Sequence, residues 1–207
     1  MAIGSELEAK IRKQGQGDRT TQYQTLGGIK GRRDTKHRLA VMKLPDNFQG
    51  KSVLDIGCNL GAMCIVAAEK NAGRVVGIDA HDRTIEIAKE YAQCAGFKNI
   101  EYYVANIDKG LACLKNTVGD HPFDYVFVLS VMNNVDKKCL VEVIKYFCKD
   151  TLYLEGHSKQ KRGHISRFIS DKLSFQDIEF LGYTKDKYTR ANFKAHTNKQ
   201  LSHECQK

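Results

Sequence analysis

The apolar positions of this chain form short and long runs that alternate along most of its length. The short runs are rich in β-branched residues, as in strands buried on both faces, and occupy residues 52–56, 74–78, 100–105, 125–129 and 151–154. The longer runs place apolar residues on one helical face and occupy residues 34–44, 61–70, 82–96, 110–114 and 137–147. Asp34 is the expected cap of the first helix. Strands that alternate with helices predict a parallel sheet covered by helices on both faces.

The end of the chain has a different pattern. Residues 175–181 and 190–195 predict two strands joined by a short polar turn, and so an antiparallel hairpin that closes the sheet. The fold class is therefore α/β: a doubly wound seven-stranded sheet, mostly parallel with a C-terminal antiparallel hairpin, and helices on both faces. The 207 residues contain no repeat or clear linker, which predicts one domain. We expect residues 1–33 to form a polar arm or lid with a short helix near 7–11, and residues 34–207 to form the core.

Composition narrows the class of protein. No apolar run approaches the roughly 18 residues that span a bilayer, and the first residues lack the order of a signal peptide. We therefore expect a cytoplasmic monomer or homodimer without a membrane partner. The seven cysteines include no CxxC pair, which predicts reduced and mostly buried thiols. The formal charge of +9 suits an anionic partner such as RNA, but the basic residues are spread along the chain, so a merely solvated surface is the alternative.

Polar residues follow the first two predicted strands, at the edge where ligands of open α/β sheets bind. The first strand leads into the loop Gly57-Cys58-Asn59-Leu60-Gly61, whose glycines permit a tight turn and a close approach to a ligand. The second strand leads to Asp79, a carboxylate that can accept hydrogen bonds from two ribose hydroxyls. The loop lacks the GxGxxG spacing of dinucleotide enzymes, so a nicotinamide cofactor fits poorly.

Three segments resemble the motifs of one enzyme family. Residues 53–61 read Val-Leu-Asp-Ile-Gly-Cys-Asn-Leu-Gly and resemble motif I of the class I S-adenosylmethionine-dependent methyltransferases, with Asn59 in place of the middle glycine. Residues 75–79 resemble the second motif of that family, and residues 123–130 resemble its fourth-strand motif. The resemblance covers roughly residues 39–155. It implies that the protein binds S-adenosyl-L-methionine and releases S-adenosyl-L-homocysteine.

The resemblance also implies a role for individual residues. Asp55 would anchor the loop or the methionine end of the cofactor, Asp79 would bind the ribose, and Asn106 would contact the adenine amino group. The other cofactor-binding residues that it implies are Gly57, Cys58, Asn59, Gly61, Ala80, His81, Ile107, Leu129 and Ser130. For Asp79 the alternative is a helix cap, and for Asn106 it is an ordinary turn residue. In the segment before motif I, Arg33 or Arg38 is the candidate partner of the cofactor carboxylate, and a solvent-exposed basic surface is the alternative.

Methyl transfer is a displacement at an electrophilic sulfonium, so the protein mainly aligns the nucleophile and can remove its proton. Asn133 and Asn134, after the fourth strand, can orient an acceptor but cannot deprotonate it. After the fifth strand, His157 is the predicted general base, with Glu155 orienting either the histidine or the acceptor. The alternative is that Glu155 pairs with a nearby Lys or Arg and His157 is a loop histidine. No spacing of ligands fits a closed metal site, so no metal is expected.

We expect methyl transfer to a hydroxyl or amino group of a small-molecule acceptor, because little of the chain lies outside the core. The Asn/Asp-Pro-Pro-Tyr signature of enzymes that act on exocyclic base nitrogens is absent after the fourth strand, which argues against DNA base methylation. One alternative is an RNA methyltransferase that uses the basic surface and residues 185–199. Another is a non-catalytic module that binds S-adenosylmethionine as a sensor or scaffold.

Overall fold

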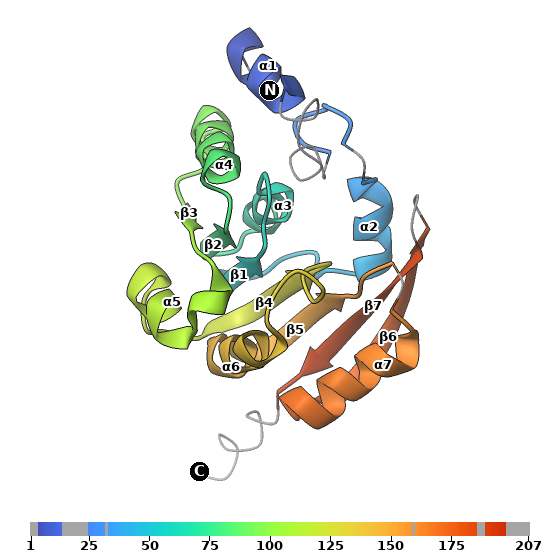
Figure 1. The fold of residues 1–207 in the computed structure, drawn as a ribbon. Helices are drawn as coiled ribbons and strands as arrows, with labels where there is room; N and C mark the ends of the chain where they lie inside the picture. Colours follow the sequence, from blue (N-terminus) through green and yellow to red (C-terminus); the bar gives the residue numbers. More distant parts are fainter. Residues whose placement is uncertain (1–3, 14–24, 32, 159, 186–188, 198–207) are drawn as a thin grey trace.

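The computed structural model describes residues 4–13, 25–31, 33–158, 160–185 and 189–197, which form a seven-stranded sheet with helices on both faces (Figure 1). The strand order is β3-β2-β1-β4-β5-β7-β6. Six strands run in one direction, and β7 runs against its neighbours β5 and β6. The strands are β1 (Ser52–Ile56), β2 (Arg74–Asp79), β3 (Ile100–Val104), β4 (Phe123–Leu129), β5 (Cys148–Glu155), β6 (Gln176–Lys185) and β7 (Thr189–His196). The predicted fold class, including the C-terminal antiparallel hairpin, is confirmed.

Two hydrophobic cores lie on opposite faces of the sheet (Figure 1). The helices are α1 (Ser5–Lys13), α2 (Thr35–Met42), α3 (Ala62–Glu69), α4 (Asp82–Cys94), α5 (Leu111–Val118), α6 (Lys137–Phe147), α7 (Arg162–Arg167), a short η1 (Ile107–Lys109) and a π-helical η2 (Phe168–Leu173). Buried residues of α1 to α4 fill one core, and those of α5, α6, α7 and η2 fill the other. Each central strand supplies both cores: Val126 and Val128 of β4 face one, whereas Phe127 and Leu129 face the other.

Local sequence signals explain where the elements begin and end. The Asp34 side chain accepts a hydrogen bond of 3.1 Å from the His37 N–H, so Asp34 caps α2 as predicted. The α2 helix ends at Lys43, which adopts a left-handed conformation two residues before Pro45. β1 and α6 occupy the predicted ranges. β6 extends further than predicted, and the helical segment α7–η2 is not predicted by the apolar pattern.

The described parts of residues 1–33 pack against the sheet domain. Leu7 and Ile11 of α1 are buried in the core that α4 also lines. Lys10 pairs with Glu90 of α4 at 3.0 Å, and the side chains of Leu26 and Ile29 are buried in the same core. The burial of these few apolar side chains fixes the position of the segment, although most of its residues are polar. The short helix expected near residues 7–11 corresponds to α1, and residues 1–3, 14–24 and 32 lie outside the described ranges.

Six of the seven cysteines lie in the described ranges, and all six are free thiols. The buried ones are Cys58, Cys64 and Cys148. Cys139 is half-buried and Cys94 and Cys113 are exposed, so three of the six described cysteines are buried where most were expected to be, and Cys205 lies outside the described ranges. None of the helices in the described ranges has the length and apolar content needed to cross a membrane.

Candidate functional site

A cavity of about 410 Å³ lies at the carboxyl ends of the central strands, where the strand order reverses between β1 and β4. The predicted site residues that line it are Arg33, Gly57, Asn59, Asp79, Ala80, His81, Asn106, Ile107, Leu129, Ser130 and His157. The further lining residues are Ile56, Ile78, Ala105, Asp108, Val131, Asn134, Val135 and Arg190. Asp55, Cys58, Gly61, Arg38 and Glu155 do not line it. The structure therefore brings most of the predicted site residues together around one cavity, and the role of each toward a cofactor stays a prediction.

The loop after β1 follows the edge of the sheet closely. The Gly57 N–H donates a 2.8 Å hydrogen bond to the Ile78 carbonyl of the next strand. Gly57 and Asn59 both have positive φ angles, of 74° and 52°. A Cβ at Gly57 would lie 2.6 Å from the Val131 side chain. Gly57 is therefore required both by its backbone conformation and by the segment that follows β4.

Gly61 serves the packing beneath the loop. Its φ is 77°, and a Cβ there would lie 2.1 Å from the Tyr102 hydroxyl. That hydroxyl donates a 3.3 Å hydrogen bond to the Gly61 carbonyl. The missing side chain of Gly61 therefore leaves room for Tyr102, and its expected role toward the cofactor stays a prediction.

The Asp79 carboxylate joins the two loops that border the cavity. One oxygen accepts a 3.0 Å hydrogen bond from the Asn59 N–H, and the other accepts one of 3.0 Å from the His81 N–H. The cap residue of α4 is His81, so the alternative that Asp79 is a helix cap does not hold. A carboxylate has about four acceptor positions, so these two bonds leave capacity for hydroxyl donors in the cavity.

The adenine end of the predicted site contains two polar side chains. Asn106 accepts a 2.9 Å hydrogen bond from the Asp108 N–H and caps η1, which is the turn role considered as its alternative. Asp108 also lines the cavity, and one of its carboxylate oxygens accepts a 2.8 Å bond from the Asp136 N–H. Asp108 was not among the predicted site residues. It stands two positions after Asn106, on the same short turn.

Asp55 and Cys58 lie below the cavity wall. Asp55 is 2% exposed and accepts a 3.6 Å hydrogen bond from the Cys64 thiol. Burial raises the pKa of Asp55 to about 7, and the charge of Arg38 opposes this rise. Burial also raises the pKa of the Cys58 thiol well above its ordinary value, so this cysteine is unreactive. Both residues are buried, and neither lines the cavity.

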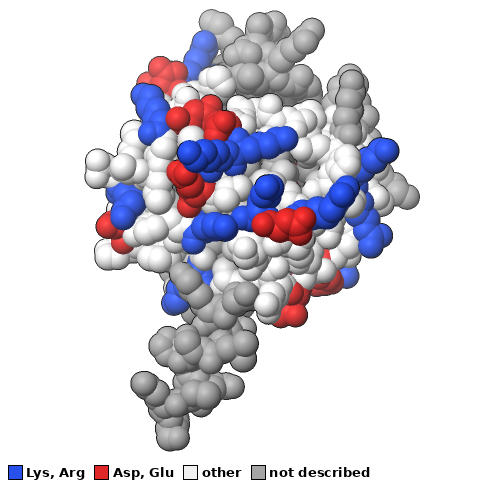
Figure 2. All heavy atoms as spheres, turned by 60° about the horizontal axis from the view of Figure 1, so that its bottom comes forward, with Lys and Arg blue, Asp and Glu red and all other residues white. Residues whose placement is uncertain are grey.

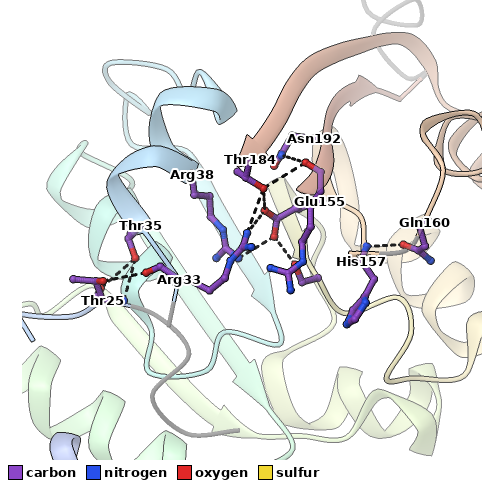
Figure 3. A network of polar contacts seen from close by, with 11 residues as sticks. Thr25, Arg33, Thr35, Arg38, Glu155, His157, Gln160, Thr184 and Asn192 are labelled. Carbon is purple, nitrogen blue, oxygen red and sulfur yellow. Dashed lines mark hydrogen bonds and ion pairs between the residues drawn. The ribbon is translucent and has the colours of Figure 1, made fainter. Parts of the chain in front are cut away.

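Glu155 is the centre of a buried ion-pair network (Figure 3). Arg33 and Ser130 each donate a short hydrogen bond to a different oxygen of its carboxylate. Arg38 donates a bond of 2.9 Å and Thr184 one of 3.0 Å, so each oxygen receives two donors. The expectation that Glu155 orients His157 is therefore corrected. Glu155 pairs with arginines, as the alternative stated, but they come from the N-terminal segment and not from nearby residues.

The network also separates the two arginine candidates. Burial would raise the pKa of Glu155, but Arg38 and Arg33 hold it below its ordinary value. Arg33 lines the cavity as well as binding Glu155. Arg38 does not line the cavity, so Arg33 is the better placed of the two candidates for the cofactor carboxylate.

His157 lines the cavity from the loop after β5. The backbone N–H of His157 donates a 2.7 Å hydrogen bond to the side-chain oxygen of Gln160. The imidazole ring points away from Glu155 (Figure 3). The ring Nδ1 lies 3.3 Å from the Ser158 hydroxyl. Partial burial and the positive charge of Arg190 lower the pKa of His157, so the ring is neutral at pH 7 and can accept a proton.

Arg190 is a cavity residue that the sequence did not identify. It is buried near the start of β7, and it reaches the site because β7 pairs with β5. In the sequence it stands in a polar, basic stretch with the pattern of a solvated surface. Among the described residues, no three His, Cys, Asp or Glu side chains are grouped so that they could hold a metal ion.

A family model of the methyltransferase domain matches residues 47–195. This match covers most of the chain, so the chain belongs to the methyltransferase domain family, and the resemblance to class I S-adenosylmethionine-dependent methyltransferases is confirmed.

Curated relatives match shorter segments. Yeast (Saccharomyces cerevisiae) protein arginine N-methyltransferase 1 is 37% identical over 32% of this chain and 19% of its own length. Ribosomal protein L11 methyltransferase of Thermotoga maritima is 28% identical over 59% of this chain and 43% of its own length. Ubiquinone biosynthesis O-methyltransferase of Neisseria meningitidis is 29% identical over 57% of this chain and 45% of its own length. The chain thus matches less than half of each relative.

Solved structures share the fold at low identity. Magnesium protoporphyrin IX methyltransferase of Synechocystis, with bound S-adenosylmethionine, has a TM-score of 0.61 and 19% identity over 95% of this chain and 86% of that chain. A SAM-dependent methyltransferase of Aquifex aeolicus has a TM-score of 0.59 and 16% identity over 79% of this chain and 93% of that chain. At these identities the likeness shows the fold alone.

Proposed function

We propose that this protein transfers a methyl group from S-adenosylmethionine to a hydroxyl or amino group of a small-molecule acceptor. The observation that carries the proposal is a single cavity that contains both the cofactor-motif residues Gly57 and Asp79 and the titratable ring of His157. Family membership supports the reaction class. The acceptor class is supported by the partly apolar wall of the cavity, which includes Val131 and Val135 as well as His157.

The residues around the cavity fit the proposed cofactor. Asp79 has carboxylate positions left for the ribose hydroxyls, and Ile107 supplies an apolar surface for the adenine ring. Gly57 has no side chain at the point where the loop meets the cavity, and Arg33 offers a positive charge for the cofactor carboxylate. When bound, S-adenosylmethionine supplies an electrophilic methyl group.

The remaining work of the protein is to orient the acceptor and remove its proton. His157 is neutral at pH 7, and its Nδ1 lies beside Ser158, so Nε2 is the atom proposed to accept the proton. Ser130, at the end of β4, has a positive φ of 65°, a strained conformation of the kind that clusters at functional sites. Its N–H donates to the Glu155 carbonyl at 2.9 Å, which holds this strand end in place.

The test is a methyl-transfer assay with radiolabelled S-adenosylmethionine and a panel of small phenols, amines and sugars, followed by total RNA. The proposal expects turnover of at least one small acceptor and loss of that turnover in Asp79→Ala. Turnover of RNA alone would replace it with the RNA alternative. Tight cofactor binding without turnover of any acceptor would favour the non-catalytic module.

The RNA alternative has two observations in its favour. A groove of about 980 Å³ between α6 and the α7–η2 segment is lined by Lys137, Lys138, Arg167 and Lys172, with Asp171 as its acidic residue. Figure 2 shows Lys and Arg side chains spread over this side of the molecule, with acidic side chains among them. The mouse 7SK snRNA methylphosphate capping enzyme is 38% identical over 33% of this chain and 9% of its own length. Residues 186–188 and 198–199 of the basic tail lie outside the described ranges.

Salt dependence distinguishes the two acceptor classes. Binding through phosphates weakens steeply as salt rises, whereas binding of a compact acceptor in the cavity depends on salt much less. A steep dependence of binding on salt concentration that is reduced in Lys137→Gln and Lys172→Gln would favour RNA.

We also propose a cytoplasmic location, since the six described cysteines are free thiols, as in reducing compartments.

A further inference from the structure

The groove between α6 and the α7–η2 segment lies beside the loops that border the cavity. Asn133 and Gln160 line this groove, and the Gln160 side chain donates a 2.8 Å hydrogen bond to the Asn133 side chain. The Gln160 oxygen accepts the 2.7 Å bond from the His157 N–H (Figure 3). A molecule bound in the groove would therefore contact the same two loops that contribute Asn134 and His157 to the cavity wall.

Apolar side chains form the base of the groove. Met132 and Ile165 line it and are only 3% and 0% exposed, which places them at its floor. Val141 of α6 and Phe168 of η2 also line it and are half-buried. Because these two side chains are partly exposed, the groove offers apolar surface to a ligand.

Basic side chains line both walls of the groove. Lys137 and Lys138 begin α6, and Arg167 and Lys172 stand on the α7–η2 segment, with all four side chains exposed. Asp171 is the acidic residue among those that line the groove. Within the described parts of the chain, none of the four basic side chains is part of an ion pair. The two walls therefore attract negative charge to both sides of an apolar floor.

The backbone of one wall has a rare conformation. Phe168–Leu173 form a six-residue π-helix, which ends at Ser174 in a left-handed conformation with a φ of 60°. Turns of π-helix are uncommon and occur frequently at functional sites. Phe168, Asp171 and Lys172 of this turn all line the groove. The conformation of the wall thus marks the same surface as the charge and the apolar floor do.

We propose that this groove is a docking site for an acidic amphipathic helix of a partner protein. Such a helix carries an apolar stripe, which matches Val141 and Phe168, and carboxylates on both sides of the stripe, which match the basic walls. The inference goes beyond the proposed function and does not depend on it. The partner would contact Asn133 and Gln160, and so would lie next to the loop that carries His157.

Two other occupants fit the groove less well. A second copy of this chain has a formal charge of +9, which disfavours its approach to a basic surface. Single-stranded nucleic acid is held by successive aromatic side chains on which its bases stack. Phe168 is the one aromatic side chain among the described residues that line the groove, and it is half-buried.

The test is fluorescence anisotropy with labelled synthetic peptides. The probe is a peptide of about 15 residues with leucine at helical spacing and glutamate at the other positions. We expect the native protein to bind it at least about tenfold more tightly than two control peptides, one with glutamine in place of glutamate and one with serine in place of leucine.

Variants of the protein locate the binding site. The double variant Lys137→Gln/Lys172→Gln should bind the glutamate peptide about fivefold to about tenfold more weakly than the native protein. The control double variant Lys36→Gln/Arg83→Gln removes the same charge from exposed positions of α2 and α4, which cover the other face of the sheet, and should bind it as the native protein does. All four positions are exposed, so the variants should fold.

Labelled single-stranded RNA of similar net charge tests the other class of macromolecule. If RNA binds more tightly than the glutamate peptide and loses this affinity in Lys137→Gln/Lys172→Gln, the groove is a nucleic-acid site and the inference is wrong. The inference is also overturned if the glutamate peptide does not bind at up to about millimolar concentration, or if either control peptide binds equally well. Equal binding of the glutamate peptide by the two double variants would likewise overturn it, because the attraction would then not come from the groove.

Discussion

Arg38 in α2 donates a hydrogen bond of 2.9 Å to Glu155 at the end of β5, across 117 positions of sequence. Arg33 binds the other oxygen of the same carboxylate. These two ion pairs hold the segment that precedes the first strand against the carboxyl edge of the sheet. Because Arg33 also lines the cavity, the position of the proposed cofactor-binding arginine depends on Glu155.

Glu155→Gln should destabilise the protein strongly. The substitution keeps the shape of the side chain but leaves two buried arginines without their anion, which typically costs about 3–5 kcal/mol. Urea unfolding measures the loss, and Glu86→Gln, at an exposed position of α4, is the control. Equal stability of the two variants would show that the ion pairs do not hold this segment.

Asp55→Asn should change how stability depends on pH. Burial raises the Asp55 pKa from 3.8 to about 7, so the folded state retains the proton that the unfolded state has already lost. The free energy of unfolding therefore falls as pH rises from about 4 to about 7, by up to about 4 kcal/mol from this group.

The Asn variant lacks this ionisation, so its stability relative to the native protein should be greatest at pH 8 and should decrease toward pH 4. Denaturant unfolding at several pH values measures the difference, with the exposed Asp46→Asn as the control. A difference between Asp55→Asn and native protein that is the same at every pH would contradict the assigned protonation.

Gly61→Ala should lower the free energy of unfolding by more than the positive φ of this residue alone explains. Gly61 and Gly96 have nearly the same φ, 77° and 79°, but an added Cβ meets the Tyr102 hydroxyl at 2.1 Å in the first case and nothing within 4 Å in the second. We expect Gly61→Ala to cost about 1–3 kcal/mol more than Gly96→Ala in thermal or urea unfolding. Similar losses would mean that backbone strain, and not contact with Tyr102, requires this glycine.

The strand and helix pattern predicted most of this fold because buried strands leave a local signature. The exception is the segment 162–173, whose buried residues Ile165, Ile169 and Leu173 are spaced by four. That spacing is a helical signal, but it covers only a few turns and begins beside Gly163 in a basic, polar stretch. The polar composition of residues 1–33 was similarly misleading, because a few apolar residues are enough to bury α1.

The candidate site was predictable only where a motif is contiguous. The loop after β1 and Asp79 are local features of two strand ends, and Gly57, Asn59 and Asp79 all border the cavity. The partners of Glu155 and the position of Arg190 depend on pairing between distant segments, which residue spacing does not encode. The residues near Glu155 in the sequence therefore predicted a catalytic role for it, whereas in the structure its carboxylate pairs with buried arginines of the N-terminal segment.

His157→Ala should reduce turnover by about 10²–10⁴-fold if His157 is the general base. Its pKa lies below the ordinary 6.5, so turnover by the native protein should rise with pH through that lowered pKa and be level at neutral pH. The variant should lose this acidic limb while binding S-adenosylhomocysteine normally. His121→Ala, at an exposed loop position, is the control. An unchanged pH profile in His157→Ala would remove the residue from catalysis.

The central claim is that the cavity at the ends of β1 and β2 binds S-adenosylmethionine through Asp79. Isothermal titration with S-adenosylhomocysteine tests it most directly, on the native protein, on Asp79→Ala and on Asp82→Ala, an exposed carboxylate outside the cavity wall. We predict roughly micromolar binding by the native protein and Asp82→Ala, and at least about tenfold weaker binding by Asp79→Ala. Absence of binding of either S-adenosylhomocysteine or S-adenosylmethionine to the native protein, or unchanged binding in Asp79→Ala, would contradict the claim.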